Sequence, residues 1–467
     1  MTDFAALLRP DRGEPARPLH LVDTTLLPEW LKAHAGQRRP LVDAARFEGK
    51  AGQILIIPGA GPYAEFEVLV GVGKLAALTP WCLAAAAERL PEGTYRLAGE
   101  MPPGAAALGW LLAQHRLTKY KSKADTPVGP RVLLSSEPAK VADTIRLAEA
   151  TALVRDLVDT PAADLGPAEL ERAVRDWAGP AGAEVEVTKG DALQHGYPMI
   201  HAVGAAATAP RAPRLIEARW GDPSHPKLAI VGKGVVFDTG GLDLKPAAGM
   251  RLMKKDMGGA AHALALARLI VAERWPVRLH LLIPAVENAV SGNAFRPGDI
   301  LTSRNGLTVE IDNTDAEGRL ILADALTRAC EEGAATIVDF ATLTGAARVA
   351  LGPDLPATFS NDDSLAADLL ASGAEVGDPL WRLPLWDGYD DMLKSELADM
   401  SNSADSPFAG TITAALFLRR FVSEGTAWAH LDTFAWRPAP KPGRPKGGEA
   451  LGLRAVHAAL ARRFRRQ

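Results

Sequence analysis

The feature that most constrains this chain is a set of charged side chains placed beside glycines or at the edges of apolar runs. An uncompensated charge in a low-dielectric site costs several kcal/mol, so such groups do not stay buried alone. Carboxylates that converge need a strong positive charge between them, and a pair of divalent cations is the simplest source. The sequence therefore predicts a metal site. Its candidate residues are Asp238, Asp256, Asp315, Glu317, Lys233 and Lys245.

Strand-like and helix-like segments alternate in the second part of the chain. Buried strands are expected at 228–231, 277–283, 335–339 and 427–431, and helices at 257–272, 318–332 and 411–422. Residues 300–303 and 307–311 flank Arg304-Asn305-Gly306, a sequence typical of a hairpin turn. This order predicts a mixed, mostly parallel sheet with helices on both faces. In such sheets ligands bind beyond the carboxyl ends of the strands, where most of the candidate residues fall.

The first part of the chain alternates in the same way. Strands are expected at 53–58, 66–70, 94–97 and 131–135, with helices over 74–90 and 104–117. A long helical pattern then begins at Ser136 and Pro138 and keeps its apolar spacing to Asp159. We predict a small N-terminal α/β domain (1–136), a connecting helix (137–160) and a larger α/β domain (161–467).

Composition excludes several classes of protein. A net charge of -4 and a pI near 6.2 give no electrostatic reason to expect nucleic acid as the main partner. Cys82 and Cys330 are the only cysteines, too few for a disulfide framework or a cysteine zinc site, and free thiols indicate a reducing compartment. No apolar run approaches the ~18–20 residues of a membrane span, and the N-terminus lacks the features of a signal peptide. We therefore expect a cytoplasmic protein.

The charged segments resemble those of the leucyl aminopeptidase family, the dinuclear-metal cytosol aminopeptidases. Residues 313–320 read NTDAEGRL, the family signature without a change. The metal-and-lysine segment appears as VGKGVVFDTGGLDLKP at 231–246, followed by MKKDMGGAA at 253–261. The resemblance covers residues 150–435. It implies a homo-hexameric enzyme that removes the N-terminal residue, leucine or another apolar one, from peptides by means of a metal-bridged hydroxide.

The resemblance also implies a ligand set. One ion would be held by Lys233, Asp238, Asp256 and Glu317, and the other by Asp238, Asp315 and Glu317. A lysine ligand must lose its proton, which a neighbouring dication favours. Mn²⁺ and Zn²⁺ both suit these ligands, and the sequence does not choose between them. The alternative for Asp256, Asp315 and Glu317 is a purely structural role as acidic groups at helix N-termini. The alternative for Lys233 is a phosphate-binding lysine, but the full Walker pattern is absent.

Two further residues have catalytic roles in the family. Lys245 would stay protonated and stabilise the oxyanion, and Arg319 would hold a bicarbonate ion that acts as general base. Their alternatives are a surface lysine before Pro246 and a surface ion pair along the helix. The latter is weakened because position 323 is Ala323 rather than an acid.

The implied substrate pocket contains Met253, Thr342, Leu343 and Gly345. Met253 offers an apolar wall for the first side chain of a peptide. The chain departs from the family at Thr239, usually serine, and in the C-terminal pocket segment, which here contains Gly448, Glu449 and Ala450. The side-chain preference is therefore open.

Two rival functions use the same features: a dinuclear phosphoesterase, and a DNA-binding protein that keeps the fold.

Overall fold

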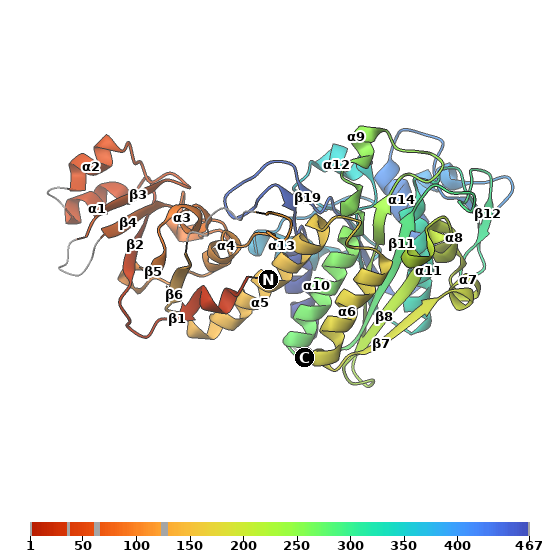
Figure 1. The fold of residues 1–467 in the computed structure, drawn as a ribbon, viewed down its shortest axis with the longest axis horizontal. Helices are drawn as coiled ribbons and strands as arrows, with labels where there is room; N and C mark the ends of the chain where they lie inside the picture. The colour runs from red at the N-terminus through yellow and green to blue at the C-terminus, as the bar shows by residue number, and fades with distance from the viewer. Residues whose placement is uncertain (1, 35–37, 60–65, 123–128, 466–467) are drawn as a thin grey trace. The chain divides into compact units, whose positions relative to one another are not determined.

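The computed structural model describes residues 2–34, 38–59, 66–122 and 129–465 (Figure 1). The chain divides into two compact units. The first contains Met1–Ala152 and Ala439–Lys446, and the second contains Leu153–Pro438 and Gly447–Gln467. The division falls inside helix α5 (Pro138–Asp159), the helix expected to connect the two domains. The domain boundaries at 136 and 160 remain predictions, whereas the two-part α/β fold class is confirmed.

The first unit contains a six-stranded sheet in the order β1-β6-β5-β2-β4-β3. All neighbouring strands are parallel except β3, which is antiparallel to β4. The strands are β1 (Leu8–Pro10), β2 (Arg17–Val22), β3 (Ile54–Pro58), β4 (Phe66–Gly71), β5 (Gly93–Leu97) and β6 (Arg131–Ser135). The helices are α1 (Leu27–Ala33), α2 (Arg38–Ala44), α3 (Ala84–Arg89) and α4 (Ala106–Leu112), with short 3₁₀ turns η1 (Phe4–Ala6), η2 (Leu75–Ala77) and η3 (Ala98–Glu100).

Two predicted helices of the first unit are wrong in length. The helix expected over 74–90 is α-helical only from Ala84 to Arg89, and the one expected over 104–117 is limited to α4. Pro80 accounts for the first difference, because it has no N–H to donate and disfavours helical geometry at Thr79 before it.

The second unit contains a nine-stranded sheet within the described residues. Strands β9, β14 and β18 are parallel, as are β9 and β11, and β10 pairs in parallel with the end of β11. On one side of the sheet, β8 is antiparallel to β11 and β7 is antiparallel to β8. On the other side, β15 is antiparallel to β18, and the short β16 is parallel to β15. The bounds are β7 (Glu184–Lys189), β8 (Arg214–Trp220), β9 (Lys227–Gly232), β10 (Gly234–Asp238), β11 (Arg278–Asn288), β14 (Thr336–Ala341), β15 (Ala357–Ser360), β16 (Trp381–Arg382) and β18 (Ala427–Asp432).

Helices cover both faces of this sheet (Figure 1). On β14, Phe340 stacks against His262 of α10 (Gly258–Ala272), whereas Ile337 shares a core with Leu320 of α11 (Glu317–Glu331). Successive strand residues face opposite sides, so α10 and α11 pack on opposite faces. The other helices are α6 (Pro167–Ala181), α7 (Asp191–Gly196), α8 (Pro198–Gly204), α9 (Ala247–Met250), α12 (Gly345–Leu351), α13 (Asp363–Glu375), α14 (Gly410–Arg419) and α15 (Leu453–Phe464).

Shorter elements complete the second unit. The expected hairpin is present as β12 (Ile300–Thr302) and β13 (Thr308–Glu310), and β13 also pairs with β17 (Met400–Ser401). A small antiparallel ribbon is formed by β19 (Trp436–Arg437) and β20 (Gly447–Gly448). Three 3₁₀ turns are η4 (Ala209–Arg211), η5 (Met253–Met257) and η6 (Asp387–Leu393). None of the helices described is both long and apolar enough to span a membrane.

Several parallel strands end at one edge of the second sheet. Strand β9 ends at Gly232, just before Lys233, and β14 ends just before Thr342. Helix α10 begins directly against these strand ends. A Cβ on its Gly259 would lie 2.1 Å from the carbonyl oxygen of Phe340, so only glycine allows this close approach. The fold therefore gathers strand ends and a helix start at the edge where ligands bind in sheets of this kind.

Candidate metal centre

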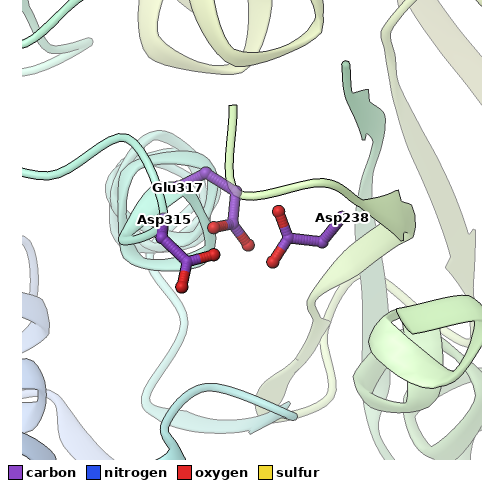
Figure 2. Close-up of side chains that lie close together, drawn as sticks. All are labelled: Asp238, Asp315 and Glu317. Atoms are coloured by element: carbon purple, nitrogen blue, oxygen red, sulfur yellow. The ribbon is translucent and has the colours of Figure 1, made fainter. Parts of the chain in front are cut away.

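Three carboxylates from two neighbouring parts of the fold face one another (Figure 2). Asp238 is the last residue of β10, Glu317 is the first residue of α11, and Asp315 lies in the turn before that helix. One oxygen from each of the three lies within 4.8 Å of the others. Asp238 and Glu317 are buried, while Asp315 is half-buried. Three acids this close need a positive charge between them.

Lys233 supplies positive charge at the buried end of this cluster. Its Nζ lies 2.8 Å from Oδ2 of Asp256 and 2.9 Å from Oε1 of Glu317, and it donates to the carbonyl of Thr342. The side chain lies on Gly318, where a Cβ would come within 2.7 Å of Nζ. The glycine of the signature thus leaves room for the lysine.

Lys245 supplies positive charge at the open end. Its Nζ lies 2.8 Å from Oδ2 of Asp238 and also pairs with Asp315. The side chains of Lys245 and Asp315 are 14% and 34% exposed, against 3% for Lys233. The four acids and two lysines singled out in the sequence therefore form one continuous cluster, closed at one end and open at the other.

Burial and mutual repulsion shift the titration of the acids. Burial, reinforced by the charge of Asp238, raises the pKa of Glu317 to about 8 and that of Asp315 to about 6. Burial alone would raise the pKa of Asp256, but Lys233 outweighs it and the pKa falls. Burial by itself would lower the pKa values of Lys233 and Lys245, but the neighbouring carboxylates have the larger effect and raise both. The lysines alone do not fully compensate the acids.

The cluster fits divalent cations. Oε2 of Glu317 is buried and has neither a hydrogen bond nor an ion pair with any residue in the described part of the chain. Such an atom carries a desolvation cost unless a ligand meets it. The donor set is carboxylate oxygen with one amine nitrogen, which suits Mn²⁺ or Zn²⁺ once the lysine loses its proton.

Arg319 lies in the first turn of α11 and lines the same site. One guanidinium nitrogen donates to the carbonyl of Asn402 at 2.7 Å, while Nε is buried without a partner in the described structure. Burial lowers the pKa of Arg319 to about 10, which leaves it protonated at neutral pH. It is therefore a fixed positive charge with an unused donor.

A cavity of about 660 Å³ opens over the cluster. All four residues expected in the substrate pocket line it: Met253, Thr342, Leu343 and Gly345. Gly448, Glu449 and Ala450 do not appear in its lining; instead Glu449 is buried and pairs with Arg155 and Arg437. The sequence departure therefore does not alter the cavity wall directly. Phe434, which the sequence did not single out, does line it.

Sequence reasoning missed the residues that hold the charged ones in place. Asn288, at the end of β11, donates to Oδ1 of Asp238 at 2.8 Å and to the carbonyl of Thr314. Asp432, at the end of β18, accepts hydrogen bonds from the backbone N–H groups of Leu343 and Thr344. Both lie at the carboxyl ends of strands, and this position is the sequence feature by which they could have been predicted as site residues. Asp243 accepts a hydrogen bond from the backbone N–H of Thr314 and so fixes the signature turn.

Comparisons with known proteins agree with this geometry. Residues 152–457 match the catalytic domain of the cytosol aminopeptidase family, and residues 17–129 match the M17 aminopeptidase N-terminal domain. A probable cytosol aminopeptidase of Syntrophotalea carbinolica is 40% identical, with 93% of each chain covered. The solved cytosol aminopeptidase of Coxiella burnetii superposes with a TM-score of 0.92 at 44% identity, covering 98% of this chain and 99% of that one. The bottromycin maturation enzyme BotP, solved in complex with Mn, gives 0.86 at 34% identity, covering 96% and 99%.

Proposed function

The chain belongs to the cytosol aminopeptidase (M17) family, a family of metal-dependent peptidases, and on this premise we propose that it removes N-terminal residues from peptides with two divalent ions. The observation that carries the dinuclear proposal is the convergence of Asp238, Asp315 and Glu317, with a buried oxygen of Glu317 left without a partner. Lys233 and Asp256 extend the cluster beyond Glu317, because Nζ of Lys233 lies 2.8 Å from Asp256 and 2.9 Å from Glu317.

In the proposed site, Lys233, Asp238, Asp256 and Glu317 hold one ion, and Asp238, Asp315 and Glu317 hold the other. Mn²⁺ and Zn²⁺ are the candidates, and the Mn complex of the BotP neighbour supports the former. When bound, the ions supply an activated water as nucleophile and a Lewis acid for the carbonyl of the first peptide bond.

The chain's own residues carry the remaining steps. Lys245 keeps its proton and donates a hydrogen bond to the carbonyl oxygen as negative charge develops there. Its position at the open end of the cluster, beside the cavity, supports this role. Arg319 would hold an anion such as bicarbonate, which would supply a general base beside the cluster. The unused Nε of Arg319 supports anion binding.

The wall formed by Met253 supports leucine or another apolar residue as one acceptable first side chain. The family resemblance supports a homo-hexamer. The free thiols Cys82 and Cys330, both partly exposed, and the name of the curated relatives support a cytoplasmic location.

A metal-reconstituted assay tests the proposal. The protein is stripped of metal with a chelator, and hydrolysis of aminoacyl-anilides is measured before and after addition of Mn²⁺ or Zn²⁺. We expect no hydrolysis in the stripped protein and recovery with close to two ions per chain by elemental analysis. Full activity in thoroughly stripped protein contradicts the dinuclear mechanism.

A further inference from the structure

Lys255 is a buried cation that the proposed chemistry does not use. It lies on η5 between Met253 and Asp256, lines the cavity and is only 6% exposed. Its ammonium makes no hydrogen bond with any residue in the described ranges. The nearest carboxylate oxygen is Oδ1 of Asp256 at 3.7 Å, and the ring centroid of Phe434 lies 5.3 Å away.

The other two lysines of the cavity are much better paired. Lys233 and Lys245 each contact two carboxylates, with oxygens within 2.9 Å of Nζ. The oxygen of Asp256 that faces Lys255 already accepts a hydrogen bond from Thr342 at 2.8 Å. A buried ammonium with one long contact lacks an anion.

A second cation lies over the same aromatic ring. The guanidinium carbon of Arg348 is 5.0 Å from the centroid of Phe434, and Arg348 also lines the cavity. Within the described structure Arg348 has no carboxylate partner either. The wall of the cavity around Phe434 therefore presents two cations: Lys255, whose one carboxylate contact is 3.7 Å long, and Arg348, which has none in the described structure.

Lys255 and Met253 line the same cavity. Met253, the proposed wall for the first side chain, is on the same short helix as Lys255. Lys245, which is proposed to meet the carbonyl oxygen, pairs instead with Asp238 and Asp315 at the open end. We propose that the cavity accepts peptides whose first residue is acidic, in addition to apolar ones, and that Lys255 binds the carboxylate of that side chain. The inference rests on the aminopeptidase function proposed above.

Substrate selectivity tests this role. In the metal-reconstituted protein, kcat/KM is measured for the p-nitroanilides of glutamate, glutamine and leucine, none of which has a free C-terminal carboxylate. The variant Lys255→Met keeps the side-chain length but removes the charge. A lost hydrogen bond to a charged group predicts a drop of about 10- to 100-fold for the glutamate substrate, with little change for glutamine and leucine. Lys255→Arg should retain much of the glutamate rate.

Lys254→Met is the matched control. Lys254 is the adjacent lysine, but it donates to the carbonyl of Asp159 and does not line the cavity. The same charge removal there should leave the glutamate-to-leucine ratio unchanged. Circular dichroism and thermal melting confirm that each variant is folded.

The outcomes separate the two levels of the proposal. If leucine is cleaved but glutamate is not, or if Lys255→Met lowers both equally, the role of Lys255 is overturned while the aminopeptidase function stands. If Lys255→Met selectively slows Leu-Gly relative to leucine anilide, the lysine binds a C-terminal carboxylate, and the assignment to the first side chain is wrong. If no substrate is cleaved, the proposed function fails. In that case a thermal shift by free L-glutamate over L-glutamine, lost in Lys255→Met, still supports the anion site, and its absence overturns it.

Discussion

Lys233 and Lys245 have the same side chain and sit at opposite ends of one carboxylate cluster. Lys233 is almost fully buried between Asp256 and Glu317, both of them also buried. Lys245 is partly exposed, and its partner Asp315 is the most exposed acid of the cluster. Both lysines have raised pKa values because carboxylates surround them. The chemistry available to each differs with its access to the cavity.

The difference indicates a division of roles. A group at the closed end cannot be exchanged for substrate atoms, so it suits permanent coordination once an ion displaces its proton. A protonated lysine at the open end can leave Asp238 and Asp315 when ions neutralise them, and can then act on substrate. The following variants test this assignment, from the largest expected effect to the smallest.

Glu317→Gln and Asp315→Asn remove charge with little change in shape, and we expect each to lose metal and to reduce peptidase activity to near background. Glu317 contacts Lys233, and Asp315 contacts Lys245, so the two variants affect the cluster from opposite ends. Elemental analysis and activity are measured together, with melting curves as the control for folding. Undiminished metal in both variants would falsify the ligand assignment.

Lys233→Met should reduce bound metal to about one ion per chain and nearly abolish turnover, because the closed end loses its amine donor. Met has a similar length and tolerates the apolar contact with Gly318. Excess Mn²⁺ should not restore the rate. If this variant keeps two ions and only its kcat falls, Lys233 is a permanent counter-charge rather than a metal ligand. The lysines at the two ends of the cluster would then not differ in metal binding.

Arg319→Ala should lower kcat with both ions retained, since Arg319 touches none of the acids and is proposed to hold an exchangeable base. Loss of a general base typically costs ~10²–10⁴ in rate. Removing bicarbonate from the buffer should slow the native protein, and adding it back should restore the rate. Equal activation of native and variant protein by bicarbonate would show that the anion acts elsewhere.

Lys245→Met should also keep both ions, and it should lower kcat by ~10²–10³, the usual effect of removing one oxyanion stabiliser. The contrast with Lys233→Met is the direct test of the division of roles. Metal content and kinetic constants are measured for both under one set of conditions. An effect on KM alone would indicate that Lys245 binds the ground state.

The sequence was sufficient to bring the charged residues together, for a physical reason. Acids and lysines after apolar strand runs must lie at the sheet edge, and the intact signature added their order along the chain. The sequence did not identify Asn288, Asp432 or Phe434 as site residues. The contacts that place them there, with Asp238, Leu343 and Lys255 respectively, are with residues 50 or more positions away in the chain. Helix lengths in the first unit were wrong where Pro80 outweighed the alanine-rich composition around it. Local pattern thus predicted which charged groups cluster, and long-range contacts determined how they are held.

Asn288→Ala is expected to have the smallest effect, and it tests whether the shared ligand needs support. Asn288 is 1% exposed and donates a hydrogen bond to Asp238, which is proposed to bind both metal ions. Its removal frees the Asp238 carboxylate to rotate. Loss of such a supporting group typically costs about 10- to 100-fold in metal affinity or activity. Metal titration should show weaker binding of both ions, and saturating Mn²⁺ should recover most of the rate.

Asn288→Asp is the sharper comparison, since it keeps the shape of the side chain but places a second acid against Asp238. We expect it to bind metal more weakly than Asn288→Ala does. If only one ion is weakened, Asp238 does not bridge, and the two ends of the cluster bind their ions independently.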